Sequence, residues 1–155
     1  MGEPMEPEPL IFAGLTLDRP HLMAVVNVTP DSFSDGGDFL DTSVAIAHGK
    51  SLIADGADIL DIGGESTRPG ANPISIDEEC VRVIPVIEGL VGEGALISID
   101  TRHAEVMQRA IKAGASIVND VTALTHDPDS AQVCLDTGVD VVLMHMQGNP
   151  QTMQD

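Results

Sequence analysis

The stretch LMAVVNVTPDSFSDGG, residues 22–37, places a short apolar run directly in front of a long polar loop. The run Leu22–Val28 is apolar and rich in β-branched residues, which is typical of a buried strand. The segment Asn27–Gly37 then carries two aspartates, two serines, a proline and a pair of glycines. A turn alone does not need this many polar and ionisable groups. An α/β barrel presents its catalytic groups on such loops, at the carboxyl ends of its strands. The stretch therefore predicts a barrel strand followed by a functional loop.

The same arrangement recurs along the chain, where short apolar runs alternate with helical patterns. We expect strands at Leu22–Val28, Asp58–Ile62, Ala95–Asp100, Ser116–Asn119 and Val139–Met144. We expect helices at roughly Ser43–Asp55, Asp77–Leu90, His103–Ala113 and Asp129–Asp136. Ser75 or Asp77 is expected to cap the second helix, and Thr101 the third. This alternation predicts a parallel sheet with right-handed crossovers and strands buried on both faces. The fold class is α/β, with about the first five βα units of a (β/α)8 TIM barrel, which typically takes about 250 residues.

The ends of the chain depart from this pattern. Residues 1–9 are acidic and proline-rich, which predicts a disordered tail, and residues 10–155 are expected to form one partial barrel domain. Leu10–Leu17 is predicted to be a short hairpin that covers the barrel floor. A half barrel leaves its first and last strands, near Val25 and Val142, as apolar edges that aggregate or need a partner. The simplest interpretation is a fragment of a longer protein.

Composition narrows the class of protein. The chain has 155 residues, enough for one domain, and its hydrophobic content of 43% supports a core. Aromatic residues make up only 2% and all of them are Phe, so the core must be aliphatic. Cys80 and Cys134 form no metal-binding pattern, and together with the lack of a signal peptide they indicate a reduced cytosol. No apolar run approaches the ~20 residues of a membrane span, so no membrane partner is expected.

The loop Asn27–Gly37 resembles the first signature of the dihydropteroate synthases, the pterin-binding enzymes of folate synthesis. Later segments resemble the family's later signatures in the family's order: GGESTRPGA (63–71), ISIDTR (97–102), IVNDV (117–121) and VVLMHMQG (141–148). Together these segments are specific, although SIDT or VNDV alone would be weak. The resemblance implies a barrel enzyme that joins 6-hydroxymethyl-7,8-dihydropterin diphosphate to 4-aminobenzoate, giving 7,8-dihydropteroate and diphosphate. The family also has a substrate-binding Asp, a Lys and a late Ser-x-Arg-x-His segment further on, and nothing in this sequence matches them.

Within the first loop, the resemblance assigns three residues. The amide oxygen of Asn27 is a hard neutral ligand suited to Mg²⁺, and by resemblance it helps to hold the metal and the diphosphate. Asp35 is similar to the family's catalytic carboxylate that faces the developing pterin cation. Phe33 is similar to the residue that helps to wall the aminobenzoate pocket. A calcium-binding loop is excluded, because Phe33 and Thr42 would stand at two of its ligand positions.

The second loop, Gly63–Ala71, suits an anion. Its two leading glycines allow close backbone approach, and the guanidinium of Arg68 offers a planar fork for an oxyanion. By resemblance Thr67, Arg68 and Pro69 close over both substrates, and Arg68 acts in catalysis. The alternative interpretation is a plain connector rich in glycine and proline.

Asp100 and Asn119 end consecutive strands. A carboxylate at the end of a buried strand is costly unless it is paired, and a pterin offers it an amino group and a ring N–H. By resemblance Asp100 and Asn119 bind the pterin ring, and Met144 forms an apolar floor beneath it.

Several polar residues stay undecided. Asp61 and Glu65 are candidate supporting groups, and Asp120 either contributes to the site or only caps the next turn. His145 follows Met144, but a lone histidine is more often structural than catalytic. No role is assigned to three histidines on or near predicted helices: His48, His103 and His126.

The charge of the chain limits its partners. Seven basic residues face 25 acidic ones, for a net charge of −18, which argues against binding to nucleic acid. Such a chain also repels anionic substrates unless local cations or a metal reverse the field, and Arg68 and Arg102 are the basic residues expected there. The resemblance implies two small-molecule substrates, the pterin diphosphate and 4-aminobenzoate, with Mg²⁺ as cofactor and a homodimer for the full-length form. An inactive fragment, a non-catalytic pterin-binding paralogue and a folate-dependent methyltransferase of the same barrel class stay open as alternatives.

Overall fold

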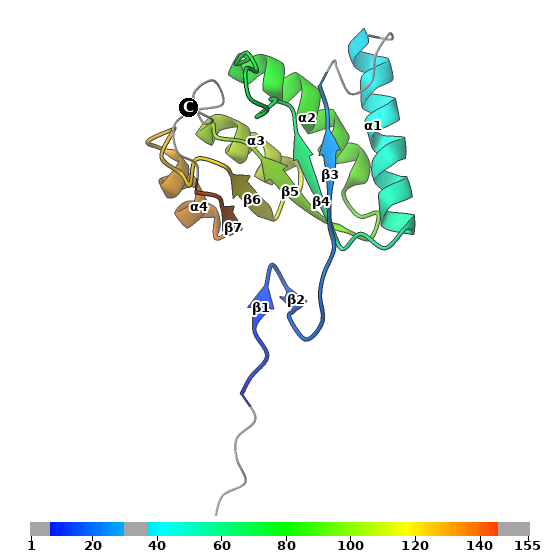
Figure 1. The fold of residues 1–155 in the computed structure, drawn as a ribbon, viewed down its shortest axis with the longest axis vertical. Helices are drawn as coiled ribbons and strands as arrows, with labels where there is room; N and C mark the ends of the chain where they lie inside the picture. Colours follow the sequence, from blue (N-terminus) through cyan, green and yellow to red (C-terminus); the bar gives the residue numbers. More distant parts are fainter. Residues whose placement is uncertain (1–6, 30–36, 146–155) are drawn as a thin grey trace, which may run out of the picture.

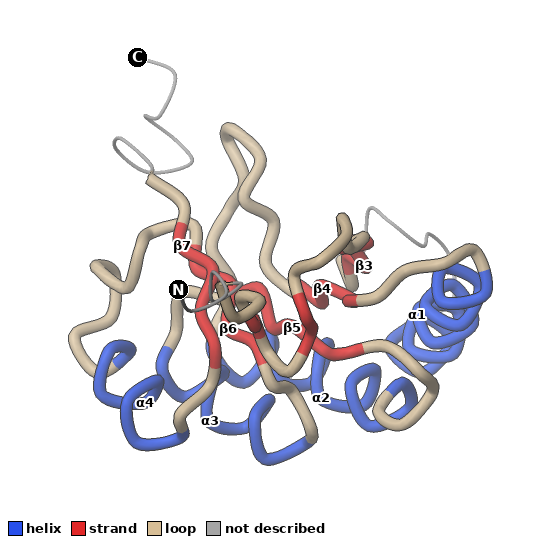
Figure 2. The backbone as a smooth tube through the Cα atoms, turned by 90° about the horizontal axis from the view of Figure 1, so that it is seen from below, coloured by secondary structure: helices blue, strands red, loops and turns tan. Residues whose placement is uncertain are grey.

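The computed structural model describes residues 7–29 and 37–145. Within these residues, five parallel strands form one sheet in sequential order: β3 (Met23–Asn27), β4 (Ile59–Gly63), β5 (Leu96–Asp100), β6 (Ile117–Asp120) and β7 (Asp140–Leu143). The helices that alternate with them are α1 (Gly37–Ala54), α2 (Ile76–Leu90), α3 (Ala104–Ala113) and α4 (Ser130–Thr137). All these helices lie along one face of the sheet (Figures 1 and 2). The predicted α/β alternation is confirmed, and each strand lies within two residues of its expected bounds.

The register of the sheet decides which side chains meet the helices and which meet the open face. Side chains alternate between faces along a strand, so residues paired across a parallel sheet share one face. One row of paired residues belongs to the buried core with the helices: Val26, Ile62, Ile99, Val118 and Val141. The next row lies at the carboxyl ends of the strands and faces the other side: Asn27, Gly63, Asp100, Asn119 and Val142.

The core between the sheet and the helices is aliphatic, as predicted. On α2, Val83, Val86, Ile87 and Leu90 have no exposed surface. Helices α1 and α2 approach closely, since a Cβ atom added at Gly49 would lie 2.6 Å from Cδ1 of Leu90. A closely packed aliphatic layer therefore joins the helices to one face of the sheet.

A hairpin lies at the amino ends of the strands. Strand β1 (Ile11–Phe12) pairs in antiparallel fashion with β2 (Leu15–Thr16), which confirms the predicted hairpin. The backbone N–H of Ala13, in its turn, donates to Oδ2 of Asp140 at 2.9 Å, at the start of β7. In Figure 1 the hairpin lies below the sheet, opposite the ends where the functional loops begin.

Strand burial differs from the expectation at both sides of the sheet. All five residues of β4 are buried, as predicted for a strand covered on both faces. Val25 of β3 is 52% exposed and Leu143 of β7 is 50% exposed, so burial on both faces is wrong for these two strands, whereas the expected apolar edges at the first and last strands are confirmed. The reason is their position, because in the described part of the chain β3 and β7 each pair with only one neighbour.

Two further expectations concern the whole chain. Most of the predicted tail, residues 1–9, lies outside the described residues, and residues 7–9 have no regular structure. Among the helices described, none has both the length and the apolar character needed to cross a membrane.

Candidate active site at the carboxyl ends of the strands

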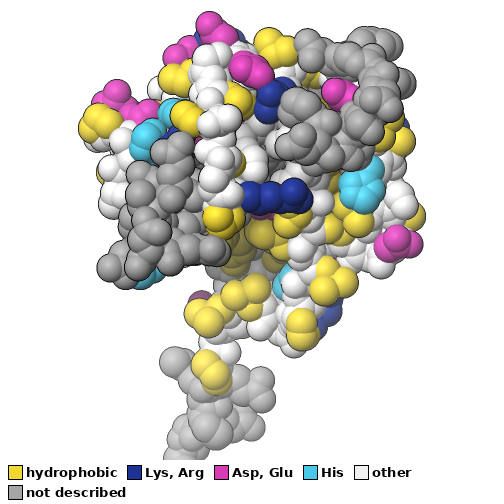
Figure 3. Space-filling view, turned by 45° about the horizontal axis from the view of Figure 1, so that its top comes forward, with side chains coloured by type: hydrophobic (Ala, Val, Ile, Leu, Met, Phe, Trp, Pro, Cys, Tyr) yellow, Lys and Arg dark blue, Asp and Glu magenta, His cyan; other side chains and the backbone are white. Residues whose placement is uncertain are grey.

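The carboxyl ends of β3 and β5 and the loop after β4 enclose a cavity of about 60 Å³. Its lining residues are Asn27, Thr29, Glu65, Ser66, Thr67, Arg68 and Asp100. Four residues that the sequence singled out therefore meet at one place: Asn27, Thr67, Arg68 and Asp100. Figure 3 looks toward this end of the sheet, where basic side chains reach the middle of the face and most acidic side chains lie around its margin.

A second cavity, of about 430 Å³, is lined by the same loop. It shares Thr29, Ser66 and Arg68 with the first cavity, and Pro69 lines it as well. Arg68 therefore borders both spaces. An arginine in this position can reach an anion in either space.

Asp100 carries the strongest electrostatic perturbation in this region. Burial, reinforced by the nearby carboxylates of Asp61, Glu79, Asp120 and Glu65, raises the pKa of Asp100 to about 7. A group of this kind favours a ligand that brings donors or positive charge.

Asp61 and Asn119 interact on the open face of the sheet. Nδ2 of Asn119 donates to Oδ2 of Asp61 at 3.0 Å. The same buried carboxylate also interacts with the hydroxyl of Ser98, its partner on the neighbouring strand β5. Burial raises the pKa of Asp61. The sequence left Asp61 as a candidate supporting group, and in the structure its carboxylate accepts a hydrogen bond from Asn119 on the open face of the sheet.

Asp120 has the structural role that the sequence left open. Its carboxylate accepts hydrogen bonds from the backbone N–H of Thr122 at 2.8 Å and of Leu124 at 3.2 Å. Ala123 and Leu124 adopt left-handed backbone conformations, with φ of 52° and 62°. Such conformations are strained for residues other than glycine, so the carboxylate of Asp120 stabilises this turn.

Arg102 differs from the expectation of a free cation at the mouth of the site. Its Nε donates to Oε1 of Glu65 at 2.7 Å, and its Nη2 donates to Oε2 at 3.2 Å. The same carboxylate of Glu65 accepts the backbone N–H of Ile74 at 3.2 Å. Arg102 is therefore committed to Glu65, whereas Arg68 lines both cavities and forms no ion pair with the residues that the structure describes.

A second buried pair lies behind the site. Glu79 of α2 has no exposed surface, and its Oε2 lies 2.9 Å from Nδ1 of His103. Burial raises the pKa of Glu79. The sequence assigned His103 no role, and Glu79 was hidden within the acidic first turn of α2, where such residues usually face solvent.

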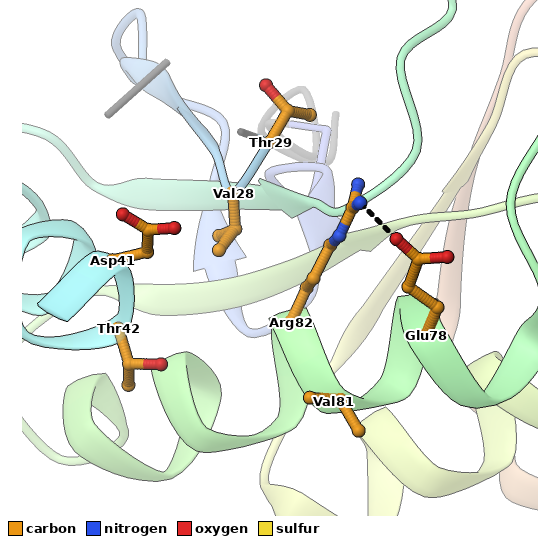
Figure 4. Close-up of a pocket in the computed structure, with 7 residues that line it drawn as sticks. All are labelled: Val28, Thr29, Asp41, Thr42, Glu78, Val81 and Arg82. Carbon is orange, nitrogen blue, oxygen red and sulfur yellow. Dashed lines mark hydrogen bonds and ion pairs between the residues drawn. The ribbon is translucent and has the colours of Figure 1, made fainter. Parts of the chain in front are cut away.

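Arg82 was also missed. Its Nη1 donates to the carbonyl oxygen of Gly64 at 2.8 Å, and Nη2 pairs with Glu78 one turn earlier in α2. Figure 4 shows its guanidinium reaching from α2 into a cavity of about 320 Å³, with Val28 and Thr29 on the β3 side. Arg82 thus holds the backbone at the base of the loop after β4. The sequence gives no sign of this contact with Gly64, because an arginine on the polar face of a helix usually faces solvent.

The other predicted site residues are not tested by this geometry. Phe33 and Asp35 lie outside the described residues. Met144 follows β7, is 43% exposed, and lines neither of the two cavities beside the loop. His145, next to it, is exposed. The assignments of Phe33, Asp35 and Met144 stay predictions.

Comparison with known proteins agrees with this geometry. The sequence pattern of the family described as "Pterin binding enzyme" matches residues 23–155. The chain is 49% identical over 142 residues to the dihydropteroate synthase of Escherichia coli (strain K12), covering 91% of this chain and 50% of that protein. The structure of Xanthomonas albilineans dihydropteroate synthase with 4-aminobenzoic acid aligns with a TM-score of 0.82 and 55% identity, covering 88% of this chain and 50% of that one. The same enzyme in complex with 7,8-dihydropteroate aligns with a TM-score of 0.76 and 51% identity, over 86% and 48%. The chain spans about half the length of the curated relatives it matches.

Proposed function

Because the chain belongs to the pterin-binding enzyme family, we propose that its site serves the synthesis of dihydropteroate. The reaction joins 6-hydroxymethyl-7,8-dihydropterin diphosphate to the amino group of 4-aminobenzoate. A carbon–nitrogen bond forms at the carbon outside the pterin ring, and the bond from this carbon to the diphosphate oxygen breaks. The products are 7,8-dihydropteroate and diphosphate.

One observation carries this proposal. Asn27, Asp100 and Asn119 share one row at the carboxyl ends of the strands, and the loop with Arg68 borders the cavity next to two of them. The strands supply carboxylate and amide groups suited to the flat polar edge of a pterin. The loop supplies a cation suited to the diphosphate and to the carboxylate of aminobenzoate. Hydrogen-bonding groups for the pterin and a cation for the anionic substrate groups therefore lie close together.

The described residues divide the work between them. Asp100 accepts hydrogen bonds from the pterin's amino group and ring N–H, Asn119 donates and accepts beside it, and Asp61 orients Asn119 by accepting a hydrogen bond from its amide. Met144 provides an apolar floor. Since the pterin ring is electron-rich, displacement can proceed through a cation once the diphosphate leaves. No strong general base is required for this step.

The loops then stabilise charge and exclude water. Arg68 faces the leaving diphosphate, and Thr67 and Pro69 close over the aminobenzoate, with Phe33 as a further wall. Asp35 steadies the pterin cation. Closure of these loops keeps water from capturing the cation before the amine attacks.

We also propose Mg²⁺ as the cofactor, held by Asn27 together with the diphosphate of the substrate. The donor set fits this ion, because Mg²⁺ prefers oxygen ligands and usually needs only one or two protein groups beside phosphates and water. Asn27 ends β3 and lines the small cavity with Asp100. When bound, the ion offsets the charge of the departing diphosphate.

Assembly and location follow by the same family relationship. We propose a homodimer for the complete protein and a cytoplasmic location. Cys80 and Cys134 are free and buried, in agreement with a reducing compartment.

The test uses the protein expressed from its complete reading frame, with the pterin diphosphate, 4-aminobenzoate and MgCl₂. We expect 7,8-dihydropteroate, identified by mass, and diphosphate in equal amounts. Arg68→Ala should lower the rate strongly with little change in melting temperature, whereas Arg19→Ala, at the opposite end of the strands, should retain the rate. Release of diphosphate without pteroate, or no product at all, would exclude the proposed reaction.

A further inference from the structure

We propose that Arg102 and Glu65 form a positioning pair that fixes the loop between β4 and α2 over the site and thereby sets the affinity for 4-aminobenzoate. The inference rests on the proposed function and adds residues to it. Neither residue needs to touch a reacting atom. Their effect passes through Thr67, Arg68 and Pro69, which lie between Glu65 and the start of α2.

The geometry of the pair is that of a fork meeting a carboxylate. Two nitrogens of Arg102, Nε and Nη2, each donate to a different oxygen of Glu65, at 2.7 and 3.2 Å. The side chain of Glu65 is 8% exposed and that of Arg102 is 18% exposed. Two parallel hydrogen bonds fix orientation as well as distance, which a single contact to a lysine would not do.

Glu65 also closes the loop on itself. The oxygen that accepts Nη2 of Arg102 also accepts the backbone N–H of Ile74, nine residues further along. One carboxylate therefore holds both the beginning and the end of the segment that carries Arg68. Without it, a loop of this length with Pro69 and Gly70 at its tip samples many conformations.

Arg102 connects this closed loop to the rigid sheet. It follows Asp100, the last residue of β5, by two positions. The distance between the loop and Asp100 is thus set by a short path through Arg102 and Glu65. On the far side of Arg102, Nη1 lies 3.5 Å from Nδ1 of His126, whose pKa is lowered by burial and by the charge of Arg102.

Stability alone does not account for such a pair. Removing two charges from water costs about as much as their attraction returns, so a largely buried ion pair is weak support for a fold. It does fix one geometry among many. A misplacement of about 1 Å in a group that positions a substrate can lower activity roughly 100-fold.

The two substrates should respond differently when the pair is broken. Asp100 and Asn119 are held by the strands of the sheet, so the pterin ring keeps its ligands. The groups over the aminobenzoate belong to the loop, so this substrate should lose affinity. A general loss of structure would weaken both substrates together.

The experiment compares Arg102→Ala and Arg102→Lys with the control Arg19→Ala in the complete protein. Arg19 pairs with Asp58 at 3.0 Å at the amino ends of the strands, so the control also removes an arginine–carboxylate pair but leaves the loop untouched. We expect Arg102→Ala to raise the KM for 4-aminobenzoate roughly 10- to 100-fold. Arg102→Lys should recover part of this loss, because it keeps the charge and loses the fork. The control should keep the KM of the unmodified protein.

Binding to the strand groups is measured separately with 6-hydroxymethyl-7,8-dihydropterin, which lacks the diphosphate. Calorimetry should give the same affinity, within about twofold, for Arg102→Ala and the unmodified protein. If Arg102→Ala does not fold, Glu65→Gln provides the same test, because the amide keeps the shape of the side chain but removes its charge and turns one acceptor oxygen into a donor. An unchanged KM for 4-aminobenzoate in an active variant, or equal weakening of both ligands, would overturn the inference. Lack of any product in the unmodified protein would instead contradict the proposed function, and pterin binding would still be measurable.

Discussion

At the scale of single residues, Asp100 is an ionisable carboxylate in a position where burial disfavours its charged form. The end of β5 is largely buried, and four other carboxylates raise the pKa of Asp100 together with that burial. A purely structural residue at this position would be an amide or a hydroxyl, which carries no such penalty. The protein keeps a carboxylate that is difficult to ionise, which is typical of a group used for binding or chemistry.

Asp100→Asn tests the binding role. The change keeps size and shape but replaces an acceptor oxygen with a donor, so hydrogen bonds from the pterin's amino and ring N–H groups are left unmade. Each unpaired buried group costs about 1–3 kcal/mol, so the affinity for the pterin diphosphate should fall roughly 10- to 100-fold. Binding of 4-aminobenzoate alone should change little. Calorimetry on both proteins measures this, and an unchanged pterin affinity would show that Asp100 only serves the following turn.

The same substitution tests the electrostatics. The folded state raises the pKa of Asp100 to about 7 from an ordinary value of 3.8, so between these pH values the folded protein binds more protons than the unfolded chain. The free energy of unfolding therefore decreases as pH rises through this window. Asp100→Asn lacks this contribution, so relative to the unmodified protein it should gain stability between about pH 5 and about pH 8. Denaturant unfolding at the two pH values decides it, and two parallel pH profiles would contradict the assigned pKa.

The sequence singled out four residues at or just after strand ends, Asn27, Thr67, Arg68 and Asp100, and the structure brings them to one cavity. The sequence did not predict their partners. Arg102 was expected as a local cation at the mouth of the site, and it pairs with Glu65. A sequence gives the charge of a side chain, but the partner depends on which loops fold together.

At the scale of elements, strands were predicted more accurately than helix ends. Apolar runs mark a strand directly, whereas a helix end depends on which group satisfies its first N–H groups. Ser75 caps α2 as expected, accepting the N–H of Glu78 at 3.1 Å. The prediction that Thr101 caps α3 is wrong. Oδ2 of Asp127, in a turn distant in sequence, accepts the N–H of Ala104 at 2.8 Å. Such a cap has no signature in the local sequence.

The contact between α1 and α2 gives a prediction at this scale. A Cβ atom at Gly49 would lie 2.6 Å from Cδ1 of Leu90, which has no exposed surface and so little room to move. Overpacking by Gly49→Ala should cost about 1–3 kcal/mol, and the gain in helix propensity returns about 1 kcal/mol, so the variant should be less stable by up to about 2 kcal/mol. Ser51→Ala, at an exposed position of the same helix, should stay within about 0.5 kcal/mol. Urea unfolding compares them, and equal stability of the two variants would mean that the helices separate without cost.

At the scale of the whole molecule, the sheet has a covered face and an open one. Helices α1 to α4 pack along one face (Figure 2). The row with Asn27, Asp100 and Asn119 faces the other side. The predicted half barrel explains this arrangement, because the face away from the helices is the interior of a (β/α)8 barrel. The same arrangement leaves apolar residues of β3 and β7 in contact with solvent, as the count of five strands predicted although the periodicity of each strand alone did not.

The last prediction concerns these edges in the 155-residue chain. Val25 is 52% exposed on β3, whose outer side has no strand partner in the described part of the chain, and such an edge is a template for pairing with another chain. We expect the isolated chain to associate increasingly with concentration in sedimentation velocity experiments. Val25→Lys should reduce the association, because a charge on an edge strand opposes pairing. Leu135→Lys is the matched control, since Leu135 is 76% exposed but lies on α4, and it should leave the association unchanged. A chain that stays monomeric at every concentration would contradict the prediction. An equal effect of the two lysines would show that general hydrophobic exposure, and not the edge of β3, governs association.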